Sequence, residues 1–470
     1  MTLSAVATAP GTRGPVAGPT IRDLLTSYRD GSRSPSGHVR AVLDQIEARG
    51  ADGTWISVDP AGAQRRASDL ETTPGASDLP LYGVPFGVKD SIDVAGWPTT
   101  LACPAYAYTA TTTAPAVQRL LDAGAVCVGK TNLDQFATGL NGTRTPYPIP
   151  RSVFGSDLIS GGSSSGSALA VALGEVPFTV ATDTAGSGRV PPALNAVIGF
   201  KPSRGLISTV GLVPACRSLD CLSLIAAHPD DVRLVFDTMV GVDERDPWSR
   251  PRRHRTVDPS TLTVGLPDES ELTFFGDQLM AEAHTDARAV VAEAFRTSTP
   301  PLAPFLAAGE LLYSGPWVAE RLVEFEDFLA DHRADVLPVV EQIISGGARF
   351  DAMDVFRAQY RLAALKSAVA RLFESMDVLL LPTVGTTFTV PEVLADPVRT
   401  NTVLGHYTHF GNLLDLCAVA VPAGITSDGR PASVMVLGPA LSDDTVLAVA
   451  DEITGRQQPV LPTRNLVRAD

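Results

Sequence analysis

Two segments rich in glycine and serine lie close together in the sequence and carry hydroxyl groups suited to nucleophilic chemistry. Residues 160–168 read S-G-G-S-S-S-G-S-A, and residues 182–189 read T-D-T-A-G-S-G-R. Glycine beside serine lets several backbone N–H groups point at the place where the serine holds its hydroxyl. With Lys89 in G-V-P-F-G-V-K-D, the two segments supply a nucleophile, a relay hydroxyl, a base and oxyanion donors without any histidine.

Lys89 can act as a base only if its amine is neutral near pH 7. A lysine in water has a pKa of about 10.4 and is protonated at that pH. Burial disfavours the charged form and lowers the pKa by several units. The residues before Lys89 read V-P-F-G-V, an apolar setting that suits such a shift.

One short motif suggests nucleotide binding. Residues 124–131 read G-A-V-C-V-G-K-T and match the phosphate-binding pattern G-x-x-x-x-G-K-[ST]. The four central residues are apolar and favour a buried strand over an open phosphate cradle. The preceding segment is helical in pattern, where a phosphate-binding loop needs a strand, so we do not expect nucleotide binding.

A second short motif suggests a different serine nucleophile. Residues 162–166 read G-S-S-S-G and fit the nucleophile elbow of α/β-hydrolases, with Ser164 at its centre. Such an enzyme needs an aspartate and a histidine further along the chain, and histidines do follow, so chain order does not exclude it. However, no H-G-G-G-like segment precedes the motif, and Gly/Ser tracts match short patterns by chance. Ser164 therefore stays an alternative nucleophile.

Five segments that follow one another over residues 83–205 form a much more specific pattern. They read G-V-P-F-G-V-K-D, G-K-T-N-L-D-Q-F-A-T-G, G-G-S-S-S-G-S-A, T-D-T-A-G-S-G-R-V-P and G-F-K-P-S-R-G. In this order and spacing the set resembles the amidase signature family. The resemblance implies a Ser–cis-Ser–Lys triad, with Ser187 as the nucleophile, Ser163 as the relay serine after a cis peptide bond, and Lys89 as the base.

The loop around the expected nucleophile also offers oxyanion donors. Consecutive backbone N–H groups can converge on a developing negative charge. The four donors expected here are those of Thr184, Ala185, Gly186 and Ser187. By the same resemblance, Asp183 and Arg189 hold this loop in place.

Within that family, four further segments resemble allophanate hydrolase. They are residues 142–147 (G-T-R-T-P-Y), 213–221 (V-P-A-C-R-S-L-D-C), 313–321 (Y-S-G-P-W-V-A-E-R) and 409–422 (H-F-G-N-L-L-D-L-C-A-V-A-V-P). The resemblance implies hydrolysis of the terminal amide of allophanate (urea-1-carboxylate), release of ammonia, and no metal or organic cofactor. The tyrosine and arginine that recognise substrate in that family fall on Tyr313 and Arg321. A guanidinium suits a planar carboxylate, and Pro316 is expected to open the helix that carries Arg321.

Other readings stay open at this point. Another small amide, as in a biuret hydrolase or a general amide hydrolase, is the alternative substrate, and a catalytically silent subunit is the alternative outside enzymes. Full-length allophanate hydrolases often carry a further C-terminal domain, which we expect to be absent here, so the fate of the product N-carboxycarbamate stays open. His406 and His409 are expected to be structural or at the rim of a pocket.

Composition limits the partners and the compartment. The chain has 470 residues and a net charge of −15, from 37 basic and 52 acidic residues, which argues against a nucleic-acid-binding surface. Its five cysteines are scattered without a C-x-x-C pair, which argues against a zinc site and fits reduced thiols. The N-terminus lacks the apolar core of a signal peptide, and no stretch approaches the roughly 20 apolar residues of a membrane span. We therefore expect a cytoplasmic protein that binds neither nucleic acid nor membrane.

The order of predicted elements indicates an α/β fold, with one central twisted mixed sheet between helices on both sides. Residues 1–18 are expected to be a disordered tail and residues 19–470 a single domain. Amphipathic helices within residues 20–50 offer a surface for a possible homodimer. The remaining elements that we expect are strands near 81–90, 125–128, 262–266 and 378–382, a helix over 114–122, and mainly helices over 278–380.

Overall fold

The strands of this chain are apolar runs whose alternate residues face opposite sides of one sheet. In the computed structural model, which describes residues 18–456, Val378 and Leu380 of β11 (Val378–Pro382) lie in one hydrophobic cluster. Leu379 and Leu381 of the same strand lie in another cluster. Because successive side chains of a strand point to opposite faces, the sheet is buried on both faces and separates two apolar layers.

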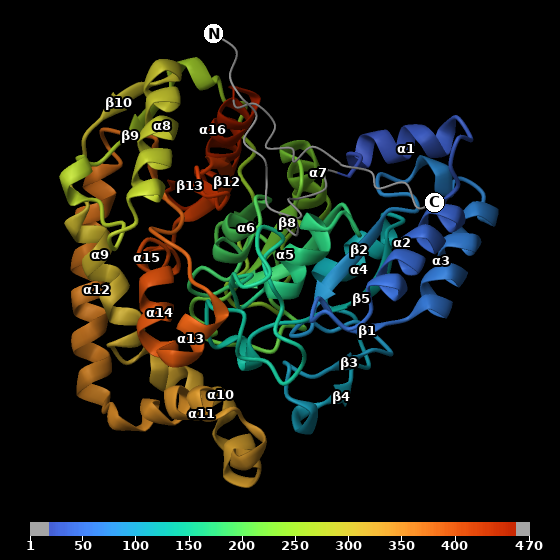
Figure 1. The fold of residues 1–470 in the computed structure, drawn as a ribbon, viewed down its shortest axis with the longest axis horizontal. Helices are drawn as coiled ribbons and strands as arrows, with labels where there is room; N and C mark the ends of the chain where they lie inside the picture. Colours follow the sequence, from blue (N-terminus) through green and yellow to red (C-terminus); the bar gives the residue numbers. More distant parts are fainter. Residues whose placement is uncertain (1–17, 457–470) are drawn as a thin grey trace.

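Eleven strands form the central sheet, in the order β1-β5-β2-β6-β8-β7-β12-β13-β11-β9-β10, and β3 pairs with β4 separately (Figure 1). The sheet is mixed, because β2 runs parallel to β5 and β6 whereas β8, β7, β12 and β13 run antiparallel to their neighbours. The predicted mixed α/β fold is therefore confirmed. The other strands are β1 Trp55–Val58, β2 Pro85–Lys89, β3 Pro98–Thr99, β4 Tyr108–Thr109, β5 Val126–Thr131, β6 Phe178–Asp183, β7 Ile198–Lys201, β8 Cys221–Ala226, β9 Thr263–Gly265, β10 Arg296–Ser298, β12 Cys417–Ile425 and β13 Pro431–Gly438.

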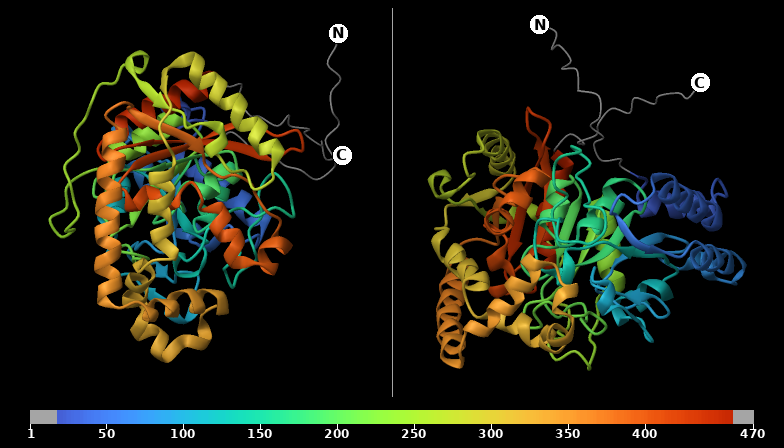
Figure 2. Two further views of the ribbon diagram at one scale, coloured as in Figure 1. Left: turned by 90° about the vertical axis from the view of Figure 1, so that its left-hand side faces the viewer. Right: turned by 60° about the horizontal axis from the view of Figure 1, so that its bottom comes forward.

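Helices cover both faces of the sheet (Figures 1 and 2). One apolar layer contains side chains of α1, α4, α7, α8 and α16. The opposite layer is formed by α2, α3 and α5 near β5 and β6, and by α9, α12 and α15 near β11 and β13. The helices are α1 Ile21–Arg29, α2 Pro35–Arg49, α3 Pro60–Thr72, α4 Pro115–Asp122, α5 Ser165–Ala172, α6 Val190–Leu194, α7 Pro229–Met239, α8 Gln278–Ala294, α9 Ala303–Tyr313, α10 Trp317–His332, α11 Pro338–Ser345, α12 Ala352–Leu372, α13 Val390–Ala395, α14 Pro397–Leu404, α15 His409–Leu413 and α16 Asp443–Arg456.

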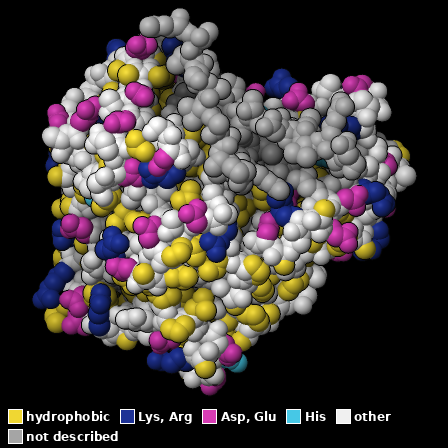
Figure 3. Space-filling view, viewed as in Figure 1, with side chains coloured by type: hydrophobic (Ala, Val, Ile, Leu, Met, Phe, Trp, Pro, Cys, Tyr) yellow, Lys and Arg dark blue, Asp and Glu magenta, His cyan; other side chains and the backbone are white. Residues whose placement is uncertain are grey.

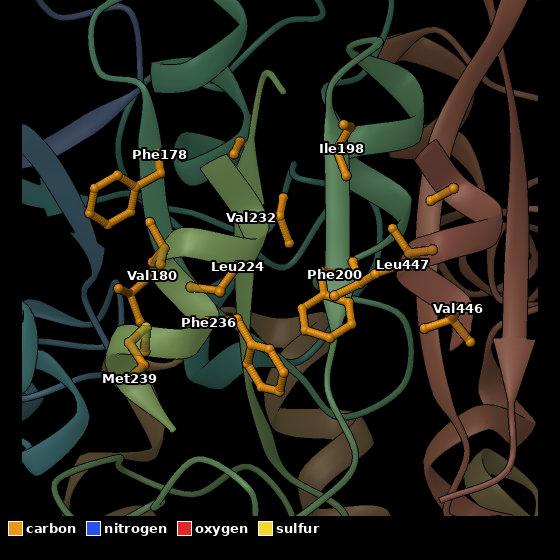
Figure 4. Close-up of a cluster of buried hydrophobic side chains, with 14 of the residues drawn as sticks. Phe178, Val180, Ile198, Phe200, Leu224, Val232, Phe236, Met239, Val446 and Leu447 are labelled. Atoms are coloured by element: carbon orange, nitrogen blue, oxygen red, sulfur yellow. The ribbon is translucent and has the colours of Figure 1, made fainter. Parts of the chain in front are cut away.

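The centre of the first layer lies between the middle strands and α7 (Figure 4). Phe178 of β6 and Phe200 of β7 are fully buried there. The ring of Phe200 meets that of Phe236 in α7 edge to face, with the centroids 5.0 Å apart, an arrangement that aromatic pairs favour. This packing fixes α7 against β7, in the middle of the sheet.

The positions of most predicted elements are confirmed, with local differences. Strand β5 continues to Thr131, so the residues of the nucleotide-binding motif lie in a buried strand, and Lys130 pairs with Asp90 at 3.1 Å. The largely helical stretch over 278–380 is interrupted by the short strand β10. The predicted N-terminal tail lies outside the described residues, except for Gly18. Within residues 18–456, no helix is long and apolar enough to cross a membrane.

The N-terminal helices do not offer the free surface that the sequence suggested for a homodimer. The apolar side chains of α1, including Ile21 and Leu24, are buried in the first layer. Those of α2, including Val39 and Val42, are buried in the second. Since both apolar faces are covered within the chain, that expectation is wrong for these helices.

Because β11 is packed on both faces, shortening one of its buried side chains should destabilise the protein. Replacing Leu380 with alanine removes a side chain that is 0% exposed, and we expect the free energy of unfolding to fall by about 2–5 kcal/mol. Urea unfolding followed by circular dichroism measures this fall. Leu394→Ala, at a side chain that is 58% exposed on α13, is the matched control and should change stability by less than about 0.5 kcal/mol. Equal losses in the two variants would contradict the assigned core.

Candidate active site

Three segments far apart in the sequence meet at one edge of the sheet. Lys89 ends β2, and Asp183 ends the neighbouring parallel strand β6. Because the carboxyl ends of parallel neighbours meet at the same edge, Lys89 lies beside the loop that follows Asp183. Ser163 belongs to the turn that leads into α5, which packs on β2 and β6. The fold therefore brings Lys89, Ser163 and Ser187 together.

These three side chains form a continuous hydrogen-bonded line. Lys89 Nζ lies 2.8 Å from Ser163 Oγ, and Ser163 Oγ lies 2.9 Å from Ser187 Oγ. The peptide bond before Ser163 is cis, as the resemblance implied. Lys89 Nζ also contacts Ser164 Oγ at 2.9 Å and Thr182 Oγ1 at 2.6 Å. Ser164 Oγ donates in turn to the Thr182 carbonyl at 3.2 Å, so its hydroxyl is held against β6.

The Lys89 amine is tuned towards its neutral form. Complete burial lowers the pKa of Lys89 to about 7, although the carboxylates of Asp134, Asp183 and Asp220 oppose this shift. The positive charge of Arg321 adds to it. The neutral amine is therefore populated near pH 7 and can accept a proton through Ser163.

A buried ion pair holds the loop that carries Ser187. Arg189 Nε and Nη2 donate to the two carboxylate oxygens of Asp183 at 2.8 and 2.9 Å, and both side chains are fully buried. Burial alone raises the pKa of Asp183, but Arg189 outweighs it and keeps that pKa below its usual value. Arg189 Nη2 also donates to the amide oxygen of Asn412 at 3.1 Å. The pair thus ties the loop to the end of β6 and to α15.

One of the four expected oxyanion donors is already used within the protein. The Gly186 N–H donates to Asp183 Oδ1 at 2.9 Å, so this residue is removed from the expected set. The N–H groups of Thr184, Ala185 and Ser187 have no hydrogen-bond acceptor within residues 18–456. Three donors therefore stay available at the loop.

The structure places Arg321 at the predicted position on its helix. Arg321 lies in the second turn of α10, after Pro316, and is 5% exposed. Its Nη1 donates to Thr138 Oγ1 at 2.6 Å and to the carbonyls of Phe136 and Ala137 at 3.2 and 3.3 Å. One arm of the guanidinium therefore clamps residues 136–138, and Arg321 is close enough to Lys89 to affect its pKa.

Tyr313 borders a cavity whose lining residues do not include Arg321. It ends α9, and its ring lies 5.0 Å from the ring of His409. Burial lowers the pKa of His409 to about 3, so this imidazole is neutral. Tyr313 and Arg144 both line a cavity of about 230 Å³, and Arg144 Nη1 donates to the Thr138 carbonyl at 2.8 Å. No hydrogen bond joins Tyr313 directly to Arg321 in the described part of the chain.

The structure adds two polar groups that sequence reasoning missed. Thr182 contacts Lys89, as described above, and Asp220 accepts hydrogen bonds from Thr184 Oγ1 and from the N–H groups of Ala215 and Cys216. Burial raises the pKa of Asp220 to about 6. Asp220 lies inside one of the segments that resemble allophanate hydrolase, which was the available signal. Its partner Thr184 is 36 residues away, and no local pattern indicates that contact.

The fold and the site together have the form of a serine hydrolase in which a lysine takes the place of histidine. A model of the family Amidase matches residues 38–447, and the chain belongs to this family.

Individual relatives narrow the similarity further. Urea amidolyase of Lachancea kluyveri is 40% identical over 434 residues, which cover 90% of this chain but only 23% of the relative. The structure of selenomethionine-substituted Kluyveromyces lactis allophanate hydrolase is 39% identical, with a TM-score of 0.89, and covers 94% of this chain and 73% of that one. A mitochondrial glutamyl-tRNA(Gln) amidotransferase chain of Mus musculus is 30% identical, over 96% of both proteins. The chain thus spans about a quarter of the length of the urea amidolyase.

The buried pair of Asp183 and Arg189 generates a stability prediction. Arg189→Met leaves a buried carboxylate without its partner, and we expect the free energy of unfolding to fall by about 3–5 kcal/mol. The double variant Asp183→Asn with Arg189→Met removes both charges and should recover part of that loss. Urea unfolding of the three proteins measures the effect. A double variant no more stable than Arg189→Met would argue against the unpaired charge as the cause.

Proposed function

We propose that this protein hydrolyses the terminal amide of allophanate through an acyl-enzyme on Ser187 and releases ammonia. The observation that carries this proposal is the line of contacts from Lys89 through Ser163 to Ser187, at 2.8 and 2.9 Å. A serine hydroxyl is a weak nucleophile until a neighbouring base removes its proton. A lysine whose pKa is lowered to about 7 is such a base.

In the first step, Ser187 Oγ attacks the amide carbonyl carbon. Its proton passes to Ser163 Oγ while the Ser163 proton passes to the neutral amine of Lys89, so the relay serine ends the step unchanged. The negative charge that develops on the carbonyl oxygen is met by the N–H groups of Thr184, Ala185 and Ser187. The C–N bond then breaks, and the proton on Lys89 returns through Ser163 to the leaving nitrogen, which departs as ammonia.

In the second step, water replaces ammonia at the same carbonyl. Lys89, neutral again, takes a proton from this water through the hydroxyl relay. The resulting hydroxide attacks the acyl carbon, and the bond to Ser187 Oγ breaks as that oxygen regains a proton. The product is N-carboxycarbamate. Asp183 and Arg189 take no part in proton transfer and position the loop.

Two observations support a substrate with a carboxylate. Within residues 18–456, Arg321 donates to protein acceptors through Nη1, and its charge adds to the lowering of the Lys89 pKa that burial causes, so Nε and Nη2 are the groups that we expect to meet a carboxylate beside the triad. The second is the 39% identity to a protein named allophanate hydrolase over most of both chains. A different small amide, such as biuret, is the alternative, since the similarity to a glutamyl-tRNA(Gln) amidotransferase chain also covers nearly the whole protein.

The role of Lys89 predicts a specific pH dependence. The amine is neutral above its pKa, so kcat/KM for ammonia release should rise with pH up to about 7 and then level off. Lys89→Met should lower kcat by about 10²–10⁴ and abolish this rise. Ammonia release between pH 5 and 9 measures both effects. A variant that keeps the rise would show that another group titrates.

Labelling by a serine-directed fluorophosphonate distinguishes the alternatives to this triad. The proposal expects label on Ser187 in the wild type and no label in Ser187→Ala. Label on Ser164 would favour the nucleophile elbow. No label at all, together with no ammonia release from any amide tested, would favour a catalytically silent protein.

Arg321 should discriminate between charged and neutral substrates. Arg321→Ala removes a charge-assisted hydrogen bond worth about 1.5–3 kcal/mol, and we expect kcat/KM for allophanate to fall about 10–100-fold. Turnover of neutral malonamide by the same variant is the control, because a displaced Thr138 clamp would lower both activities together. An equal fall for the two substrates would count against carboxylate recognition.

We further propose that the protein is one domain over residues 19–470, is cytoplasmic and acts as a homodimer. All five cysteines are buried and unpaired, which supports a reducing compartment. A mass in solution of twice 49.3 kDa would support the homodimer.

A further inference from the structure

Helix α12 has two apolar faces, and only one of them is covered by the chain. The inner face buries Leu362 and Val369 in the cluster that also contains Phe305 of α9. The outer face carries large apolar side chains that are open to solvent: Met353 (59% exposed), Phe356 (55%) and Tyr360 (72%). In Figure 2, α12 runs along the outer edge of the molecule, and no described segment covers its outer side.

The exposed side chains form one stripe along the helix. Met353, Phe356 and Tyr360 follow each other at spacings of three and four residues, which places them on the same face. The rings of Phe356 and Tyr360 lie 6.5 Å apart. At the same spacing the stripe continues with Ala363, Ser367 and Ala370, which are small and also exposed. The helix therefore has a bulky first half and a flat second half on one continuous face.

We propose that this face binds the same face of a second copy of the chain, with the two α12 helices antiparallel about a two-fold axis. Such a pair places Met353 against Ala370, Phe356 against Ser367 and Tyr360 against Ala363 of the partner. Each bulky side chain then fills the space above a small one, so the face is complementary to itself, as a two-fold interface requires. A parallel pair would oppose bulky residues at one end and leave a gap at the other.

The charges beside the stripe favour the same arrangement. Asp351 and Asp354 lie at the start of α12, and Arg371 lies in its last turn. Antiparallel pairing brings Arg371 of one copy near the two aspartates of the other. In the single chain Arg371 Nη1 donates to Ser367 Oγ at 2.9 Å, Asp354 lies 3.7 Å from Arg357, and the two aspartates cap the start of α12 by accepting from each other's backbone N–H. A carboxylate has two oxygens with several acceptor sites, so each aspartate can keep its capping bond and also accept from Arg371 of the partner.

A second exposed apolar patch, formed by Leu394 and Val398, fits this role less well. Leu394 and Val398 are 58% and 54% exposed on α13 and α14, where hydrophobic side chains show on the face in Figure 3. Val398 also lines the cavity that Tyr313 borders, so a partner seated there would cover part of that cavity. This patch has no matching series of small residues. It serves as the control surface.

The inference rests on the homodimer proposed above, not on the proposed hydrolysis. Sedimentation velocity of the full chain at micromolar concentration should give twice the chain mass for the wild type. Phe356→Glu with Tyr360→Glu should raise the dissociation constant at least ~100-fold, because two charges would be buried at the seam. Val398→Glu should leave the dimer intact. Thermal unfolding checks that each variant is folded, since the replaced side chains are exposed in the single chain.

Cross-linking tests the direction of the helices. Met353→Cys chains mixed with Ala370→Cys chains should be joined by a short bis-maleimide, whereas either variant alone should not. Cross-linking of each variant alone would show a parallel pair and overturn the proposal. A monomeric wild type would overturn both the homodimer and this seam. A dimer that survives Phe356→Glu with Tyr360→Glu, or that Val398→Glu dissociates, would overturn the seam alone.

Discussion

The burial of Lys89 is the constraint on which the rest of the site depends. A buried ammonium group must be stabilised by the protein or lose its proton. Here the hydroxyl groups of Ser163, Ser164 and Thr182 contact Lys89 Nζ, and no carboxylate of the described residues does. Hydroxyls can both accept and donate, so they satisfy the amine in either protonation state. A carboxylate at the same distance would keep the lysine protonated and unable to act as a base. The nearby aspartates act only over longer range, and burial outweighs them.

Two of those aspartates, Asp183 and Asp220, have hydrogen-bond partners other than Lys89 at the same edge of the sheet. Asp183 is paired with Arg189 and accepts two N–H groups of the nucleophile loop. Asp220 accepts from Thr184 and from its own turn. Both carboxylates therefore accept hydrogen bonds from groups in or beside the loop that carries Ser187, and neither accepts one from Lys89 within residues 18–456. The loop is held rigidly, and its remaining N–H groups stay free to meet a developing oxyanion.

The order of predicted elements indicated the mixed α/β fold, and the resemblance of five sequence segments to the amidase signature family implied which residues meet. The structure brings those residues together through β2, β6 and the turn before α5. The contacts of Thr182 with Lys89 and of Asp220 with Thr184 could not be predicted from the sequence. Asp220 reaches Thr184 because β8 runs antiparallel to β6, with Cys221 opposite Asp183, and that register depends on long-range pairing. The hydrogen bond from the Gly186 N–H to Asp183 Oδ1 likewise depends on the orientation of the Asp183 side chain, which the sequence does not show. Helical periodicity predicted helices over 278–380. The sequence of α12 shows apolar residues on two faces, but it does not show which of the two faces another element covers.

The two faces of α12 connect the outer surface to the candidate site. Its inner face packs on α9 through Leu362 and the cluster that holds Leu311 and Leu312. Helix α9 ends at Tyr313, which borders the cavity and packs against His409 of α15. Helix α15 also carries Asn412, whose amide oxygen accepts a hydrogen bond from Arg189. A partner that fixes α12 from outside therefore supports the packing that positions Tyr313. Proteins position a site more accurately on packed helices than on free loops, and α9 gains that support from both sides only if the outer face of α12 is also covered.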